Sequence, residues 1–146
     1  MAKLRHPSRL ECSDPTLFPP ELRDWGFPYL DREWTWVIEV DSTPIALVIC
    51  SFAGGMLVIW RILSTSSAKR VESTWFWASL PKILDNARLR GCVAYLSMFD
   101  DAHESETQLA RILTRAGGVL KPFKGMLGVG PIPGVNDASV GTNTAA

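Results

Sequence analysis

The stretch EWTWVIEVDSTPIALVICSFAGGMLVIWRIL, from Glu33 to Leu63, decides the fold. Its opening residues alternate between apolar and polar, which predicts a strand with one covered face made by Trp34, Trp36, Ile38 and Val40. After turn residues 41–43 and Pro44, the continuous apolar run 45–52 predicts a strand buried on both sides. Gly54-Gly55 predicts a tight turn into a third strand over residues 56–63. The stretch therefore predicts an antiparallel three-stranded meander.

The same stretch has to be weighed as a membrane span, because Ser42–Trp60 carries no charged side chain. Its length approaches the roughly 20 residues that a spanning helix needs. Two buried strands joined by a turn explain Pro44, the paired glycines and the many β-branched residues together, whereas a helix only tolerates them. The flank before it is also acidic, which does not fit the positive-inside pattern. We therefore expect strands, with a membrane-associated protein as an alternative.

Downstream residues predict a crossover. Residues 68–90 have helical spacing, and Pro81 predicts either a kink or a helix that begins near Ser79, with Gly91 as its terminator. The apolar run 92–99 predicts a strand parallel to the third one, because a helix separates the two. Residues 104–116 predict an amphipathic helix, and 119–129 a terminal strand or hairpin broken at Pro122. The sum is an α+β fold with a mixed sheet.

Length and composition predict one compact domain of 146 residues with a net charge of zero. The charge balance argues against bulk electrostatic binding to nucleic acid or an anionic membrane. We divide the chain into a proline-rich arm over 1–32 with one short helix from Pro20 to Gly26, a domain over 33–130, and a polar tail over 131–146 that is flexible or ordered by a partner. The opening residues lack the apolar stretch of a signal peptide, so we do not expect secretion.

The three cysteines, Cys12, Cys50 and Cys92, have no C-x-x-C spacing and predict reduced, structural thiols. Asp100, Asp101 and His103 follow a strand, but solvated loop acids explain them more simply than catalysis or a metal site. Hydroxyls and cations in STSSAKR make a weak anion candidate from Ser66, Ser67, Lys69 and Arg70. Large aromatic side chains that could anchor a partner are Trp75, Phe76, Trp77, Trp25 and Phe27.

The segments ILDNARLRGCVAYLSMF and LARILTRAGGVL, set in this order of elements, resemble the acyl-CoA N-acyltransferase (GNAT) family over about Trp34 to Val129. The chain is more similar still to acetyltransferase-like virion-associated proteins of short-tailed bacteriophages. That second resemblance rests on Pro44-Ile45-Ala46, on Lys69-Arg70, and on Arg111-Ile112-Leu113 running to Gly117.

The resemblance also exposes departures from the enzyme pattern. The family's diphosphate loop, Arg/Gln-x-x-Gly-x-Gly/Ala, is expected to fall on Val71, Thr74 and Phe76, which supply neither the charge nor the glycines. A Phe76 ring would then lie where the phosphate should. The family's general acid, a tyrosine, is expected to fall on Leu113 or Thr114, and neither replaces it.

We therefore expect a non-catalytic structural component of a phage virion, assembled in the host cytoplasm and partnered by virion proteins or copies of itself. This reading has no catalytic residue, cofactor, metal, nucleic-acid contact or membrane span. The alternative is an acyl-CoA-dependent N-acyltransferase with an atypical cofactor loop. It would bind acetyl-CoA phosphates through Arg70 and the hydroxyls of residues 64–67, and use Glu39 or Asp100 as the base.

Overall fold

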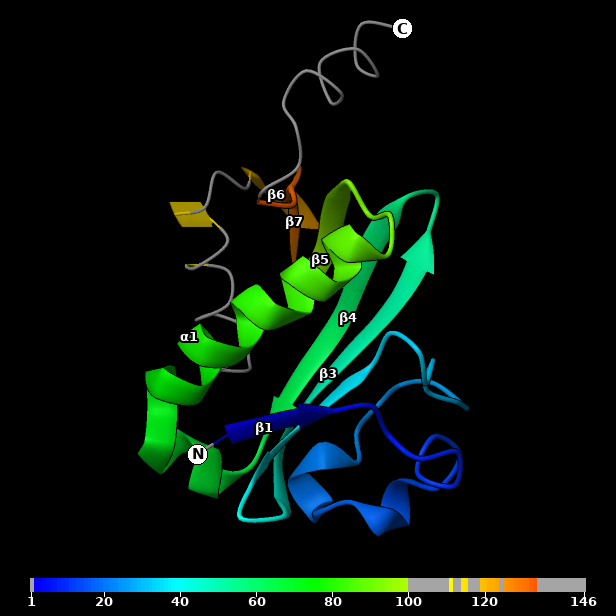
Figure 1. Cartoon of the computed structure of the whole chain (residues 1–146), viewed down its shortest axis with the longest axis vertical. Coiled ribbons are helices and arrows are strands. Elements are labelled where there is room, and N and C mark those ends of the chain that lie inside the picture. The colour runs from blue at the N-terminus through cyan, green and yellow to red at the C-terminus, as the bar shows by residue number, and fades with distance from the viewer. Residues whose placement is uncertain (1, 100–110, 112–113, 116–118, 124, 134–146) are drawn as a thin grey trace, which may run out of the picture.

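A computed structural model of the chain describes residues 2–99, 111, 114–115, 119–123 and 125–133. They form one seven-stranded sheet with the strand order β1-β2-β3-β4-β5-β7-β6. The long helix α1 lies against one face of this sheet, and the N-terminal arm lies against the other (Figure 1). The α+β mixed sheet predicted from the sequence is confirmed.

The central meander consists of β2 (Trp36–Val40), β3 (Thr43–Ala53) and β4 (Met56–Ser64), paired antiparallel. The turns at Asp41-Ser42 and Gly54-Gly55 both use left-handed backbone, as two-residue hairpin loops require. β3 begins earlier than predicted and includes Pro44. A register shift next to Ile45 accommodates that proline, because Ile38 pairs with Ala46 but Glu39 pairs with Pro44.

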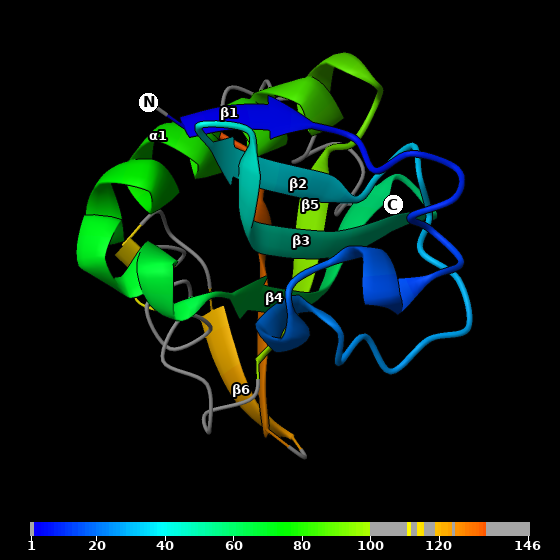
Figure 2. The same ribbon diagram turned by 90° about the horizontal axis from the view of Figure 1, so that it is seen from below.

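The arm is more ordered than the sequence indicated. β1 (Ala2–Arg5) pairs antiparallel with β2 and extends the sheet (Figure 2). Two short 3-10 helices, Pro15–Leu17 and Pro20–Leu22, replace the predicted helix from Pro20 to Gly26. The second ends early because the Arg23 N–H bonds the Pro20 carbonyl and the chain then turns toward Gly26, whose φ is +75°. Strand β1 went unpredicted because its partner lies more than thirty residues away.

The crossover is confirmed, with one correction. α1 (Ser66–Leu89) joins β4 to β5 (Ala94–Phe99), and β4 and β5 are parallel. The helix starts at Ser66 and contains Pro81 in its interior, so the alternative start near Ser79 is wrong. Gly91 ends it as predicted, at φ +97°, with the Cys92 N–H on the Ala87 carbonyl and the Gly91 N–H on the Arg88 carbonyl.

The C-terminal hairpin is also confirmed, but the predicted break at Pro122 is wrong. β6 (Val119–Phe123) and β7 (Gly125–Pro131) pair antiparallel, and β7 lies beside β5. Pro122 is accommodated because β6 is an edge strand. The predicted helix over 104–116 lies outside the described residues, apart from positions 111, 114 and 115. The predicted tail over 131–146 begins too early, because Pro131 belongs to β7 and Ile132 is buried in the core. From residue 134 onward the tail lies outside the described residues.

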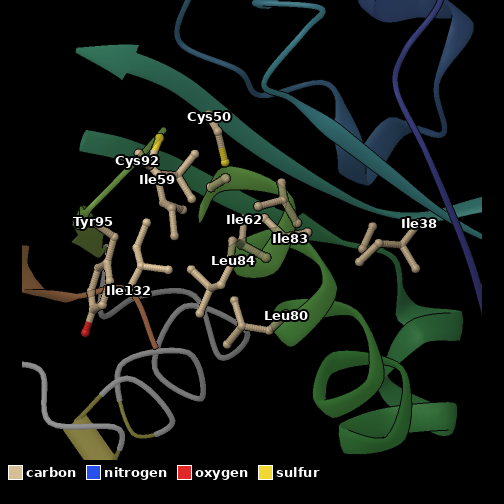
Figure 3. Packing of buried hydrophobic residues seen from close by; sticks show 14 of the residues in the cluster. Ile38, Cys50, Ile59, Ile62, Leu80, Ile83, Leu84, Cys92, Tyr95 and Ile132 are labelled. Carbon is tan, nitrogen blue, oxygen red and sulfur yellow. The ribbon is translucent and has the colours of Figure 1, made fainter. Parts of the chain in front are cut away.

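Two apolar clusters hold the sheet between its layers. Between the sheet and α1, side chains such as Ile59, Ile62, Ile83 and Leu84 interlock (Figure 3). On the opposite face Phe18, Leu22, Trp25 and Leu30 of the arm pack on Val37, Leu47, Ile49 and Leu63. All three cysteines are free and buried in these clusters, as predicted. In the described part of the chain, no helix combines the length and hydropathy needed to cross a membrane.

Candidate functional site

The candidate site lies where two parallel strands of the sheet separate. β4 and β5 pair from Met56 with Ala94 to Ile59 with Ser97, and no ladder bond joins them beyond this point among the described residues. β4 nevertheless continues to Ser64 beside β3, and β5 continues to Phe99 beside β7. The two strands therefore diverge around a gap that opens toward the start of α1.

A β-bulge in β4 marks the same point. Ile49 pairs with Arg61 but Cys50 pairs with Ile59, so Trp60 is an extra residue in the ladder. The bulge directs two consecutive side chains, Trp60 and Arg61, toward the arm. The Trp60 ring packs edge-on against Phe27 at 5.4 Å, and Arg61 Nη1 lies 3.4 Å from Asp24 Oδ2. Bulges commonly re-aim side chains beside functional sites.

On the α1 side of the sheet, β5 carries two hydroxyl groups that are buried without a hydrogen-bond partner among the described residues. They belong to Tyr95 and Ser97, which share one face of the strand. Ser97 occupies the last position at which β5 pairs with β4, so its hydroxyl sits where the gap begins. Burial raises the pKa of Tyr95, which therefore stays protonated. Buried orphan hydroxyls of this kind are rare and call for a water or ligand.

The first turn of α1 lies at the open end of the gap. Only Thr65 separates β4 from α1, and its N–H bonds the Ile45 carbonyl. The unsatisfied N–H groups of the helix start therefore belong to residues 66–68, within the anion candidate made by Ser66, Ser67, Lys69 and Arg70.

This start corrects the expected position of the diphosphate loop. Val71, Thr74 and Phe76 lie inside α1, after its first turn, because the helix begins earlier than the family pattern had been counted. Phe76 is therefore not a residue of the helix start, where a diphosphate would bind. The departure that remains is a one-residue connection without glycine.

Of the two predicted bases, the structure describes only Glu39, and it does not place Glu39 at this gap. Glu39 is on β2 and forms an ion pair with Arg5, so it is engaged elsewhere. Asp100 and Leu113 lie outside the described residues, while Thr114 is exposed. In the part of the chain that the structure describes, no three His, Cys, Asp or Glu side chains form a metal-binding group.

The predicted interface residues differ in how far the structure describes and exposes them. Trp25 is a correction, because it is buried at 2% exposure against Phe18 and donates its indole N–H to the Leu22 carbonyl. Phe27 is partly exposed against Trp60. Trp75, Phe76 and Trp77 belong to α1, but their side chains lie outside what the structure describes.

Sequence reasoning missed both features that define the gap. Ser97 carried a usable signal, since it is the one serine inside the apolar run of β5. The bulge at Trp60 carried none, because a register shift depends on the partner strand.

Comparison with solved structures shows that several acetyltransferases share this fold. The chain superposes on diaminobutyrate acetyltransferase from Paenibacillus lautus, in complex with its substrate and coenzyme A, with a TM-score of 0.68 and 12% identity, covering 94% of this chain and 98% of that one. The ribosomal-protein-S18-alanine N-acetyltransferase of Escherichia coli gives 0.65 and 13%, covering 94% and 97%. A GNAT-family acetyltransferase of Staphylococcus aureus gives 0.62 and 7%, covering 90% and 99%.

No family model and no curated protein sequence matches the chain. At these identities the likeness shows the fold alone, and the fold is that of the GNAT acetyltransferases.

Proposed function

We propose that this chain is an acyl-CoA-dependent N-acyltransferase with an atypical cofactor loop. The observation that carries the proposal is the divergence of β4 and β5 at Ile59 and Ser97, with the first turn of α1 at its open end. An extended chain with amide groups can lie along a strand that has lost its neighbour, as peptides do at sheet edges. The pantetheine arm of an acyl-CoA is such a chain.

Features of the described residues fit the two ends of this ligand unequally. The buried Ser97 hydroxyl, without a partner among the described residues, supplies a hydrogen-bonding group at the narrow end of the gap. The start of α1 supplies backbone N–H groups for a diphosphate, and the sequence has Lys69 and Arg70 in this part of the helix. The glycine-free, one-residue connection is the poorer fit. When bound, acyl-CoA would supply an activated acyl group, while the chain's residues hold and orient it.

The test is calorimetric titration of the full chain with acetyl-CoA. We expect saturable binding that Ser97→Ala weakens about fivefold, the loss of one hydrogen bond. Tyr95→Phe is the matched control, because it removes the other unpartnered hydroxyl, two residues before Ser97 on the same face of β5. The affinity of this variant for acetyl-CoA should equal that of the wild type. Absence of saturable binding overturns the proposal, and so does equal weakening by both variants.

A second proposal remains a non-catalytic assembly component of a bacteriophage particle. The short connection at Thr65 favours it, because a diphosphate needs close backbone approach at that point. Its partners would be virion proteins or copies of this chain, without cofactor, metal or nucleic acid. The same titration separates the two proposals, since a scaffold of this kind would show no acetyl-CoA binding and would instead sediment with the virion.

A further inference from the structure

At the opposite end of α1 the structure holds a cavity that the proposed acyltransferase site does not use. It has a volume of about 250 Å³ and is lined by His6, Arg32, Glu33, Asn86 and Arg90. The lining comes from the end of β1, from the loop before β2 and from the last turns of α1. At 1.5 Å per residue, Asn86 lies about 30 Å along α1 from Ser66. The two sites are therefore separate.

Arg90 is held rigidly at this cavity. Its guanidinium stacks over the Trp34 ring, 3.7 Å from the ring centroid, and its Nη1 donates to the Glu33 carbonyl. The Trp34 ring itself stacks on Phe52 at 5.1 Å. An arginine fixed in this way loses less side-chain entropy when it binds an anion than a free one does.

Arg32 is anchored at one end only. Its Nε–H donates to the Pro7 carbonyl at 3.1 Å, and the terminal guanidinium N–H groups have no hydrogen-bond partner among the described residues. Two arginines thus line one cavity, and the terminal N–H groups of Arg32 are available to a ligand.

His6 contributes an imidazole of defined orientation to the same lining, and in the neutral ring its Nε2 is an acceptor. Its Nδ1 lies 2.9 Å from the Thr35 carbonyl, which can only accept, so this nitrogen carries a proton. The ring packs on Trp36 at 3.9 Å, which fixes the direction of Nε2. The side-chain amide of Asn86 lines the same cavity.

The negative charge in the cavity lining, that of Glu33, is held by only one weak ion pair among the described residues. Glu33 Oε2 is 3.9 Å from Arg90 Nη2, and the glutamate side chain is 79% exposed. An exposed pair at this distance contributes little, so an anion can displace the carboxylate. The lining therefore carries two arginines against one labile glutamate.

We propose that this cavity binds a phosphate group, with Arg32 and Arg90 as its cationic contacts. The phosphate displaces the Glu33 carboxylate from its ion pair with Arg90. The arginine donors come from two separate segments, the loop before β2 and the end of α1. The oxygens of a tetrahedral phosphate can accept hydrogen bonds from both arginines, whereas a planar carboxylate is satisfied by one arginine in its own plane. The volume is below that of typical cofactor pockets, so the ligand is inorganic phosphate or a small phosphomonoester. The proposal does not depend on the acyltransferase assignment.

The test is a titration of the full chain with sodium phosphate, followed by ¹H–¹⁵N NMR. The indole N–H signals of Trp34 and Trp36 are the reporters, since these rings contact Arg90 and His6 of the cavity lining. We expect saturable shifts with phosphate and none with sodium chloride at matched ionic strength. Phenyl phosphate should saturate the same signals if the site takes monoesters, and failure of both phosphates overturns the proposal. Acetate binding as tightly as phosphate overturns the choice of phosphate in favour of a carboxylate.

Three variants sharpen the result. Arg32→Gln should weaken phosphate binding about tenfold, through loss of a charge-assisted contact. Glu33→Gln should tighten it severalfold, because the competing charge is gone, and a purely structural role for these residues predicts no tightening. Lys3→Gln removes the same charge from exposed β1, outside the cavity lining, and should leave affinity unchanged. Unchanged affinity in both cavity variants contradicts the proposal.

Discussion

At the scale of single residues, the buried hydroxyls of Tyr95 and Ser97 separate function from stability. Neither group has a hydrogen-bond partner among the described residues, so the desolvation cost of each hydroxyl is not offset by a hydrogen bond. A residue kept in spite of such a cost is a candidate for ligand contact. Figure 3 shows the Tyr95 ring among the apolar side chains between β5 and α1.

The stability consequence is directly testable. Ser97→Ala and Tyr95→Phe should each raise the free energy of unfolding, by on the order of 1 kcal/mol, because each removes an unsatisfied buried polar atom. Urea denaturation of the free chain measures this. A loss of stability in either variant would show that water satisfies the hydroxyl in solution.

The turn between β2 and β3 stores backbone strain. Asp41 and Ser42 have φ values of +50° and +63°, a region that costs side-chain-bearing residues about 1 kcal/mol each. Ser42→Gly should therefore raise the unfolding free energy by about that amount, measured by urea denaturation. Gly55→Ala is the mirror control. It should lower stability, although nothing lies within 4 Å of an added Cβ, because the backbone at φ +78° resists it.

At the scale of elements, an ion cluster fastens β1 and the arm to β2. Arg5 pairs with Glu11 of the arm at 2.7 Å and with Glu39 of β2. The hydrogen bond from Arg5 lowers the pKa of Glu11 below its ordinary 4.5, against a smaller opposing effect of burial. The carboxylates thus hold Arg5 charged, and the pKa of Arg5 is raised accordingly.

This cluster predicts acid sensitivity with a definite sign. The unfolded chain takes up a proton at Glu11 at higher pH than the folded chain does, so the stabilisation is present above pH 4.5 and is lost as pH falls through the lower, folded pKa. Urea midpoints measured from neutral pH down to about 3 should fall for the wild type. Arg5→Gln should lower the midpoint at neutral pH and flatten its decline.

Arg9→Gln, an exposed charge in the same arm, is the control and should keep the wild-type profile. An Arg5→Gln profile that falls as steeply as the wild type would place the acid-sensitive group elsewhere.

At the scale of the whole molecule, the two faces of the sheet are covered unequally. One face carries a 24-residue helix closed by a C-terminal cap, whereas the other carries an arm with two three-residue 3-10 helices. Short elements with few ladder bonds open more readily than the sheet they cover. We therefore expect the arm to open locally while the sheet and α1 stay intact.

The buried thiols report on this difference. Burial raises the pKa of Cys12 and Cys50, so both react only after exposure. Cys12 belongs to the arm and is buried between the arm and the sheet, while Cys50 lies between the sheet and α1. Alkylation in native buffer, followed by mass spectrometry, should modify Cys12 well before Cys50. Equal rates would mean that the arm opens only with global unfolding.

Local patterns in the chain were enough to predict the meander, the crossover and the helix end at Gly91. Alternation from Trp34 to Val40, the apolar run of β3 and the paired glycines each act over a few residues. The pairing of β1 with β2, the bulge at Trp60 and the covering of Val37 by the arm could not be predicted that way. Each depends on a partner that is remote in sequence and on a register set by packing.

In the candidate site, too, some features follow from local sequence and others only from contacts between distant segments. Amino-acid order alone determined that a helix with hydroxyls and cations at its start follows the third strand of the meander, because capping chemistry and helical spacing are local. Only the tertiary structure decided that β5 leaves β4 at Ser97, that Glu39 is paired with Arg5, and that His6, Arg32 and Arg90 share a cavity. The physical reason is that sheet divergence and charge pairing are contacts between distant segments, fixed by how the two covering layers pack.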